Sequence, residues 1–168
     1  MPPFGHFRLD ATAAGYGILA TLPLLGLLRW CLSTEWGPMR RLVGLVEEHI
    51  TPYLAGASAW GLVLLSFMAG IGEEVLFRGV IQAGLADRLP AWLAVGIAAL
   101  LFGAAHWVTM SYAVFATLIG AYLGILFLVT GNLLAPAVTH ALYDAVALSV
   151  LVRLKPGARG SGVIFPPG

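Results

Sequence analysis

Residues 70–79 read GIGEEVLFRG and place two carboxylates and a guanidinium directly after a long uncharged run. Residues 51–72 contain no Asp, Glu, Lys or Arg, and Glu73, Glu74 and Arg78 then follow without a strong turn signal. On a helix, Glu74 and Arg78 have the spacing at which a carboxylate reaches a cation. Glu73 projects about 100° away and lacks that partner. Because ionisable groups within a membrane span are costly, this stretch predicts a functional site inside an apolar helix.

The composition predicts an integral membrane protein. Of the 168 residues, 60% are hydrophobic and 10% are charged, and the mean hydropathy is +0.91. Soluble domains carry roughly 25% charged residues. The net charge is only +1, and the basic residues form no stripe, which argues against a nucleic-acid partner. Cys31 is the single cysteine, so an internal disulfide and a multi-cysteine metal site are excluded.

We expect an all-α fold, a polytopic integral membrane protein with about five transmembrane helices plus one interfacial amphipathic helix. A span needs about 20 residues. The uncharged runs that predict spans are 11–28, 51–72, 90–105, 107–130 and 133–152. Residues 39–50 carry apolar side chains on one helical face and charges elsewhere, a pattern typical of a helix lying in the membrane interface.

The predicted organisation is one transmembrane helical domain between two tails. The N-terminal tail is 1–10, the domain is 11–155 with its polar motifs within 70–144, and 156–168 is expected to be a disordered C-terminal tail. One straight helix over 52–86 would be about 50 Å long, which exceeds a hydrocarbon core of about 30 Å. A break is therefore expected at Gly56, at Gly61 or at the Gly70 and Gly72 pair.

The basic residues predict an orientation in the cell membrane. They gather near Arg29, Arg40 and Arg41 and again in the last 16 residues. If both groups face the cytoplasm, as the positive-inside rule favours, five spans place the N-terminus outside and the C-terminus in the cytoplasm.

Four polar residues are predicted to meet at one depth in the membrane. Counted at 1.5 Å per residue from turns on the same side, Glu73 and Asp144 lie roughly 20 Å deep, His106 roughly 24 Å and His140 roughly 13 Å. A glutamate can act as a general base toward water, and imidazoles can share a proton or stabilise an oxyanion. The same residue types can also ligate zinc, and their spacing does not decide between the two.

Three motifs resemble those of a known family. EEVLFRG at 73–79, FGAAH at 102–106 and HALYD at 140–144 are similar to the EExxxR, FxxxH and HxxxN motifs of the CPBP intramembrane proteases, which comprise the CAAX prenyl endopeptidases and the bacteriocin-processing Abi proteins. The resemblance implies that Glu73 activates water together with His106 and that His140 holds the oxyanion. It also implies that Asp144 takes part in catalysis. Supporting roles are implied for Glu74, Arg78 and Phe102.

The last motif departs from the usual pattern of the family. It ends in Asp144, where the family usually has Asn. An ionised Asp only accepts hydrogen bonds, whereas Asn also donates them. Asp144 therefore serves the oxyanion only if it is protonated, and otherwise it orients His140.

The leading hypothesis is an intramembrane endopeptidase that hydrolyses a peptide bond of a membrane-associated or lipidated protein. A glutamate-type mechanism without a cofactor is favoured over a divalent metal such as zinc, whose ligands would be Glu73, His106, His140 and Asp144. The expected partners are membrane lipid and a protein or peptide substrate with a membrane-proximal cleavage site. Candidate substrates are a lipidated C-terminus, a bacteriocin leader and a C-terminal sorting tail.

Two alternatives do not require proteolysis. A small proton-coupled carrier could use the buried polar residues as a relay, although the sequence shows no inverted repeat. An immunity or partner-binding protein could have kept the motif residues while losing catalysis through Asp144.

Overall fold

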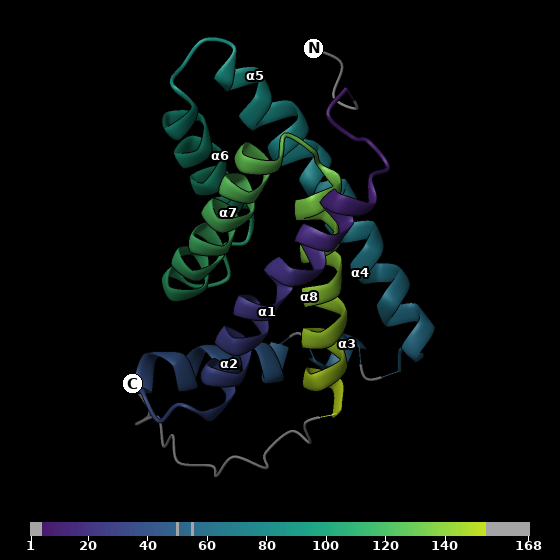
Figure 1. Ribbon diagram of the computed structural model, residues 1–168. Coiled ribbons are helices and arrows are strands. Elements are labelled where there is room, and N and C mark those ends of the chain that lie inside the picture. The colour runs from purple at the N-terminus through teal and green to yellow at the C-terminus, as the bar shows by residue number, and fades with distance from the viewer. Residues whose placement is uncertain (1–4, 50, 55, 154–168) are drawn as a thin grey trace.

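The computed structural model describes residues 5–49, 51–54 and 56–153, and all regular secondary structure in them is helical (Figure 1). This confirms the predicted all-α membrane fold. The predicted C-terminal tail, 156–168, lies outside the described residues. The elements are α1 (Ala11–Ser33), α2 (Gly37–His49), α3 (Thr51–Leu54), α4 (Ala59–Glu74), η1 (Val75–Gln82), α5 (Ala83–Ala86), α6 (Ala91–Ala105), α7 (Met110–Thr130) and α8 (Leu134–Arg153).

Among the residues that the structure describes, four helices are long and apolar enough to cross a membrane: Ala11–Ser33, Ala59–Ala86, Met110–Thr130 and Leu134–Arg153. The second of these joins α4, η1 and α5 into one continuous rod whose middle part, η1, is a π-helix. The predicted span 90–105 corresponds to α6, which is apolar but has only 15 residues, or roughly 22 Å. α6 ends where the predicted run ends, because His106 leaves the helical conformation.

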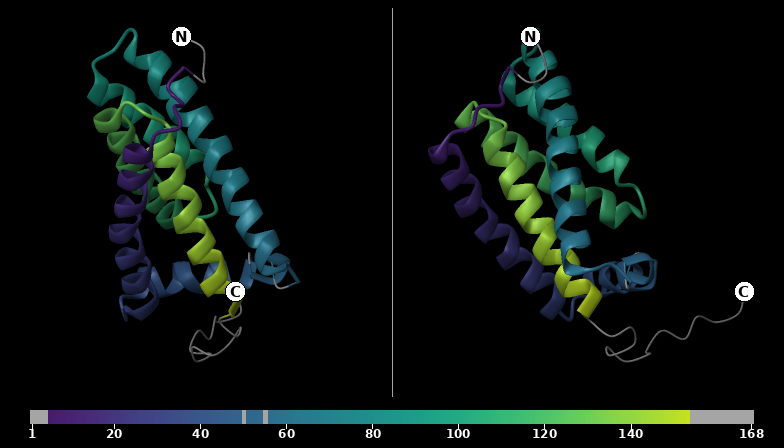
Figure 2. Two further views of the ribbon diagram at one scale, coloured as in Figure 1. Left: turned by 45° about the vertical axis from the view of Figure 1, so that its right-hand side comes forward. Right: turned by 90° about the vertical axis from the view of Figure 1, so that its right-hand side faces the viewer.

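The break expected in the second span occurs near Gly56. α3 ends before this residue and α4 begins after it, where the Ser58 side-chain oxygen accepts a hydrogen bond from the Gly61 N–H. Gly61, Gly70 and Gly72 lie inside α4. The break lets α2 and α3 lie across the end of the bundle, at the end where α8 finishes (Figure 2). This position fits the predicted interfacial helix, and its buried residues Met39, Leu42 and Val43 pack with Cys31 of α1.

α8 lies between α1 and α4 and approaches both closely (Figures 1 and 2). A Cβ on Gly17 of α1 would lie 2.6 Å from the Ala135 carbonyl oxygen, and a Cβ on Gly70 of α4 would lie 2.8 Å from the Ala141 nitrogen. Thr139 also donates a hydrogen bond to the Gly17 carbonyl at 2.9 Å. Small residues and interhelical hydrogen bonds are the usual means of packing helices in membranes. The contacts at Gly17 and Thr139 fix α8 relative to α1, and the contact at Gly70 fixes α8 relative to α4.

The chain reverses between α7 and α8 at Gly131, which has a left-handed φ of 60°. The next residue, Asn132, is buried and accepts a hydrogen bond from the Arg8 N–H at 3.1 Å, and its amide donates to the Arg8 carbonyl at 2.9 Å. Leu133 N–H donates to the His6 carbonyl. Part of the predicted N-terminal tail is therefore held against the α7–α8 turn.

Candidate active site

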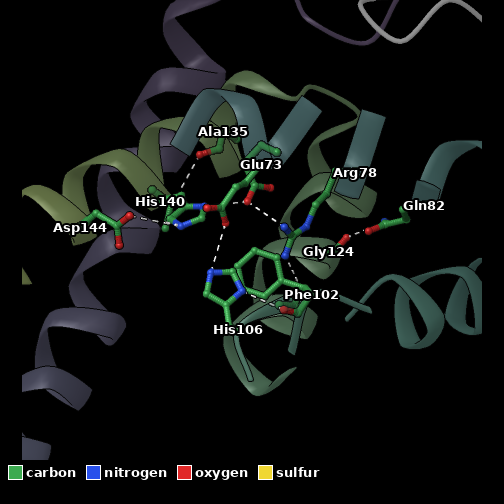
Figure 3. Close-up of polar contacts among 12 residues, drawn as sticks. Glu73, Arg78, Gln82, Phe102, His106, Gly124, Ala135, His140 and Asp144 are labelled. Atoms are coloured by element: carbon green, nitrogen blue, oxygen red, sulfur yellow. Dashed lines mark hydrogen bonds and ion pairs between the residues drawn. The ribbon is translucent and has the colours of Figure 1, made fainter. Parts of the chain in front are cut away.

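All seven residues singled out in the sequence have their side chains in one region of the bundle (Figure 3). The end of α4 and the π-helix η1 supply the first motif, the end of α6 supplies the second, and α8 supplies the third. The residues are Glu73, Glu74, Arg78, Phe102, His106, His140 and Asp144. Their chemical roles remain predictions, but their side chains form one connected set.

Three of these side chains form a buried layer. The side chains of Glu74 and Arg78 are each 1% exposed, and Arg78 Nη1 donates to Glu74 Oε1 at 2.8 Å. The same oxygen lies 2.9 Å from His140 Nδ1, whose side chain is 7% exposed. A buried charge needs such pairing to offset the loss of hydration. Glu74 thus fixes both the guanidinium and the imidazole.

The other three polar side chains form an accessible layer. Those of Glu73, His106 and Asp144 are 31%, 27% and 26% exposed. Glu73 Oε2 lies 3.5 Å from His106 Nε2, and Asp144 Oδ2 lies 3.5 Å from His140 Nε2. Both separations are longer than a good hydrogen bond. These side chains are partly exposed, but the Glu73 Oε2 atom is itself buried and has no hydrogen-bond partner among the described residues.

The hydrogen bond made by His106 determines which of its nitrogens can accept a proton. His106 Nδ1 lies 2.8 Å from the Phe102 carbonyl oxygen. Because a carbonyl oxygen only accepts hydrogen bonds, Nδ1 carries the hydrogen and Nε2 of the neutral ring is an acceptor. Nε2 faces Glu73 Oε2, which is also an acceptor. A water molecule that donates to both would be polarised by both.

Phe102 connects the two layers. Its ring is stacked on His106 with centroids 4.4 Å apart and lies edge-to-face with His140 at 5.8 Å. The Arg78 guanidinium carbon lies 4.7 Å from the centroid of the same ring. Phe102 is 3% exposed and also packs on Phe77. This phenylalanine therefore holds both imidazoles and the guanidinium at defined positions.

Gln82 belongs to the same polar set and was not predicted from the sequence. It is 3% exposed, and its Nε2 donates to the Gly124 carbonyl at 3.0 Å. A signal was present, because Glu74, Arg78 and Gln82 follow one another at four-residue intervals in an apolar helix. Gly120 and Gly124 form a small-xxx-small pattern, which by itself indicates only close helix packing.

An apolar groove of about 740 Å³ lies between α1, α2 and α7. Its lining includes Leu27, Trp30, Trp36 and Leu118. None of the seven site residues is among the residues that line it. The groove is therefore a separate apolar feature of the bundle and is not part of the candidate site.

The four residues predicted as zinc ligands do not surround a common point. In the structure they lie as two pairs, Glu73 with His106 and His140 with Asp144. Across residues 5–49, 51–54 and 56–153, no group of three or more His, Cys, Asp or Glu residues has an arrangement that could hold a metal ion. The side chains as placed do not fit a zinc site.

Comparison with known proteins agrees with the motifs. The family model described as type II CAAX prenyl endopeptidase Rce1-like matches residues 55–146, a region that contains all seven site residues. The uncharacterized protein YpbD of Bacillus subtilis (strain 168) is 33% identical over 88 residues, which are 51% of this chain and 42% of that protein. The chain thus spans less than half of the length of this curated relative. No solved structure matches the chain. With more than half of its length matched by the family model, the chain belongs to the Rce1-like family of type II CAAX prenyl endopeptidases.

Proposed function

We propose that this protein is an intramembrane endopeptidase in which Glu73 and His106 activate the water that hydrolyses a peptide bond. The single observation that carries the proposal is the pair of facing acceptors, Glu73 Oε2 and His106 Nε2, which lie 3.5 Å apart; Glu73 Oε2 is buried and has no hydrogen-bond partner among the described residues. A base must lie within reach of the proton it removes, and a water admitted beside these two atoms would be within reach of both. Membership of the family supports proteolysis in general.

In the proposed reaction the water oxygen attacks the carbonyl carbon of the substrate while Glu73 accepts one of its protons. The carbonyl oxygen then carries the negative charge of a tetrahedral intermediate. When the C–N bond breaks, Glu73 returns the proton to the leaving nitrogen, so that a carboxyl and an amine are produced. No protein atom forms a covalent bond with the substrate.

His140 is proposed to stabilise the oxyanion through Nε2–H. Its Nδ1–H is directed at Glu74 Oε1, so Nε2 can donate a hydrogen bond only if the ring carries both protons. Asp144 Oδ2, 3.5 Å from Nε2, provides a negative charge beside that form of the ring. The ionised Asp144 would then orient and charge His140 rather than contact the oxyanion.

Membership of the family and the position of the site inside an apolar helical bundle support a substrate that carries a membrane anchor. A lipidated C-terminus and a C-terminal membrane tail both fit this description, and a bacteriocin leader is a further candidate. Such a substrate would reach the site from the bilayer, with its peptide bond near the accessible layer. The proposed orientation keeps the N-terminus outside and the C-terminus in the cytoplasm, because α2 and the end of α8, which carry basic residues, lie at the same end of the bundle.

The function is tested by cleavage of a peptide panel with the purified protein in lipid vesicles. The panel contains a farnesylated CAAX-type peptide, the same peptide without the lipid, a peptide with a C-terminal membrane tail and a bacteriocin leader peptide, each with and without a strong chelator. We expect cleavage of at least one membrane-anchored peptide, at a rate that the chelator does not change.

Other results of the same panel would contradict parts of the proposal. Loss of cleavage with chelator and its recovery on adding zinc would replace the glutamate-type mechanism by a metal-dependent one. The same panel is also run with Asp144→Asn. Cleavage by this variant but not by the natural chain would show that the natural chain has lost catalysis. Absence of cleavage in both would overturn the peptidase assignment.

His140→Ala is expected to lower kcat by about 10²- to 10³-fold, the usual loss when one oxyanion donor is removed. Since His140 also contacts Glu74, the variant must be shown to be folded by its unfolding midpoint in detergent. The matched control is His49→Ala, because His49 is an exposed histidine of α2 outside the site. Equal turnover by the two variants would remove His140 from the mechanism.

A further inference from the structure

We propose that Gln82 is a positioning residue of this active site: by anchoring the π-helix η1 to α7, it determines where Arg78 and Glu74 hold His140. The inference rests on the proposed function for its kinetic test, although the contacts themselves do not depend on it. Gln82 contacts neither imidazole and has no proposed part in the chemistry.

The anchor consists of two parallel hydrogen bonds. Arg78 Nη2 donates to the Gly120 carbonyl at 2.7 Å, and Gln82 Nε2 donates to the Gly124 carbonyl at 3.0 Å (Figure 3). Both donors lie 42 residues before their acceptors, so the two bonds share one register between η1 and α7. Both donor side chains are buried. Each bond is therefore shielded from competition by water.

The glycines of α7 make these carbonyls accessible. A Cβ on Gly124 would lie 2.8 Å from Gln82 Oε1 and 3.2 Å from Val95 Cγ1, so a side chain at position 124 would displace Gln82. A Cβ on Gly120 would lie 3.2 Å from Phe102 Cδ1. The small-residue face of α7 is thus a pair of acceptors for η1 as well as a packing surface for α6.

The winding of η1 explains why it needs an external anchor. π-Helical turns are rare, occur mostly as short segments and are frequently found at functional sites. η1 has eight residues and begins directly after Glu74. Its residue Arg78 donates to Glu74 Oε1, which in turn contacts His140 Nδ1. Without the bond at Gln82, the second turn of η1 can relax toward ordinary α-helical winding and carry Arg78 with it.

The test compares Gln82→Met with Tyr122→Phe. Methionine keeps the unbranched shape of glutamine and removes both polar groups of its amide. Tyr122→Phe is the matched control, because it removes another bond from a side chain to a backbone carbonyl between helices, from Tyr122 Oη to the Ala20 oxygen at 2.8 Å. A small misplacement of a catalytic group can cost up to about 10²-fold in rate. We expect Gln82→Met to lower kcat about 10- to 100-fold with little change in KM, and Tyr122→Phe to change neither.

A second variant and a second measurement keep the inference testable if Gln82→Met folds poorly. Gly124→Ala should displace Gln82 and produce the same loss of kcat, and the double variant should lose little more than either single one, because both remove one contact. The side-chain ¹⁵N resonances of His140 in labelled protein should shift in Gln82→Met and stay unchanged in Tyr122→Phe.

The outcomes separate this inference from the proposed function. Equal kcat for Gln82→Met and Tyr122→Phe, or His140 resonances that are unchanged in Gln82→Met, would overturn the positioning role. A natural chain that cleaves no peptide while its His140 resonances still respond to Gln82→Met would overturn the peptidase assignment and leave the positioning role standing.

Discussion

Glu73→Gln is expected to lower the kcat of peptide cleavage by about 10²- to 10⁴-fold, the usual contribution of a general base. Glutamine has the size of glutamate but cannot take a proton from water at neutral pH. The Glu73 side chain is 31% exposed and its nearest ionisable partner is His106 at 3.5 Å, so folding should change little. Cleavage of the membrane-anchored peptide in vesicles, followed beside the unfolding midpoint, measures both effects.

The control for this variant is Glu48→Gln, which makes the same chemical change at an exposed position on α2. It is expected to cleave at the rate of the natural chain. If Glu73→Gln also retained that rate, the proposed base would be wrong, and His106 or a metal-bound water would have to be considered in its place.

Arg78→Met is expected to destabilise the protein by about 3–5 kcal/mol, the cost of leaving a buried charge without its partner. The partner is Glu74, whose side chain is 1% exposed and whose Oε1 takes the Arg78 hydrogen bond at 2.8 Å. The Gly120 carbonyl loses its contact with the guanidinium as well. Unfolding in detergent micelles, monitored by circular dichroism, gives the loss of stability.

Two further variants show whether this loss comes from the buried pair. Arg40→Met breaks an ion pair with Glu35 whose side chains are 53% and 86% exposed, and exposed pairs contribute about 0–1 kcal/mol. Adding Glu74→Gln to Arg78→Met removes the stranded charge and should recover much of the stability, but not the activity. Equal stability of Arg78→Met and Arg40→Met would contradict the account of the buried layer.

Much of the fold could be predicted because the bilayer leaves few choices to an apolar chain. Runs of about 20 uncharged residues must become helices, since a membrane satisfies no free backbone groups. The interfacial helix was visible in the spacing of its charges. The length of the second span predicted a break but left its position open among Gly56, Gly61 and the Gly70 and Gly72 pair. The bounds of α6 agree with the uncharged run 90–105, because His106 interrupts the apolar sequence and also ends the helix.

The site was predicted only in part, because periodicity locates residues on a helix but does not say which helix they face. The spacing of Glu74 and Arg78 predicted their ion pair, and depth counting predicted that the histidines and carboxylates share one level. The division into buried and accessible layers depends on contacts between residues of different helices. Glu74 and His140, for example, are in contact although they lie 66 residues apart in sequence. Gln82 was missed because its partner is a backbone carbonyl, which every residue carries.

The π-helical winding of η1 constrains the number of residues in this segment more than it constrains their identities. An α-helix joins residues four apart and a π-helix joins residues five apart, so each wide turn accommodates one residue more. Loss of one residue from the segment would return it to α-helical winding and rotate Gln82 away from α7 relative to Glu74. Leu76 and Val80 point outward and are exposed, so their identities can drift among apolar residues. Over evolution, we expect this segment to tolerate substitution on its outer face while insertions and deletions are eliminated.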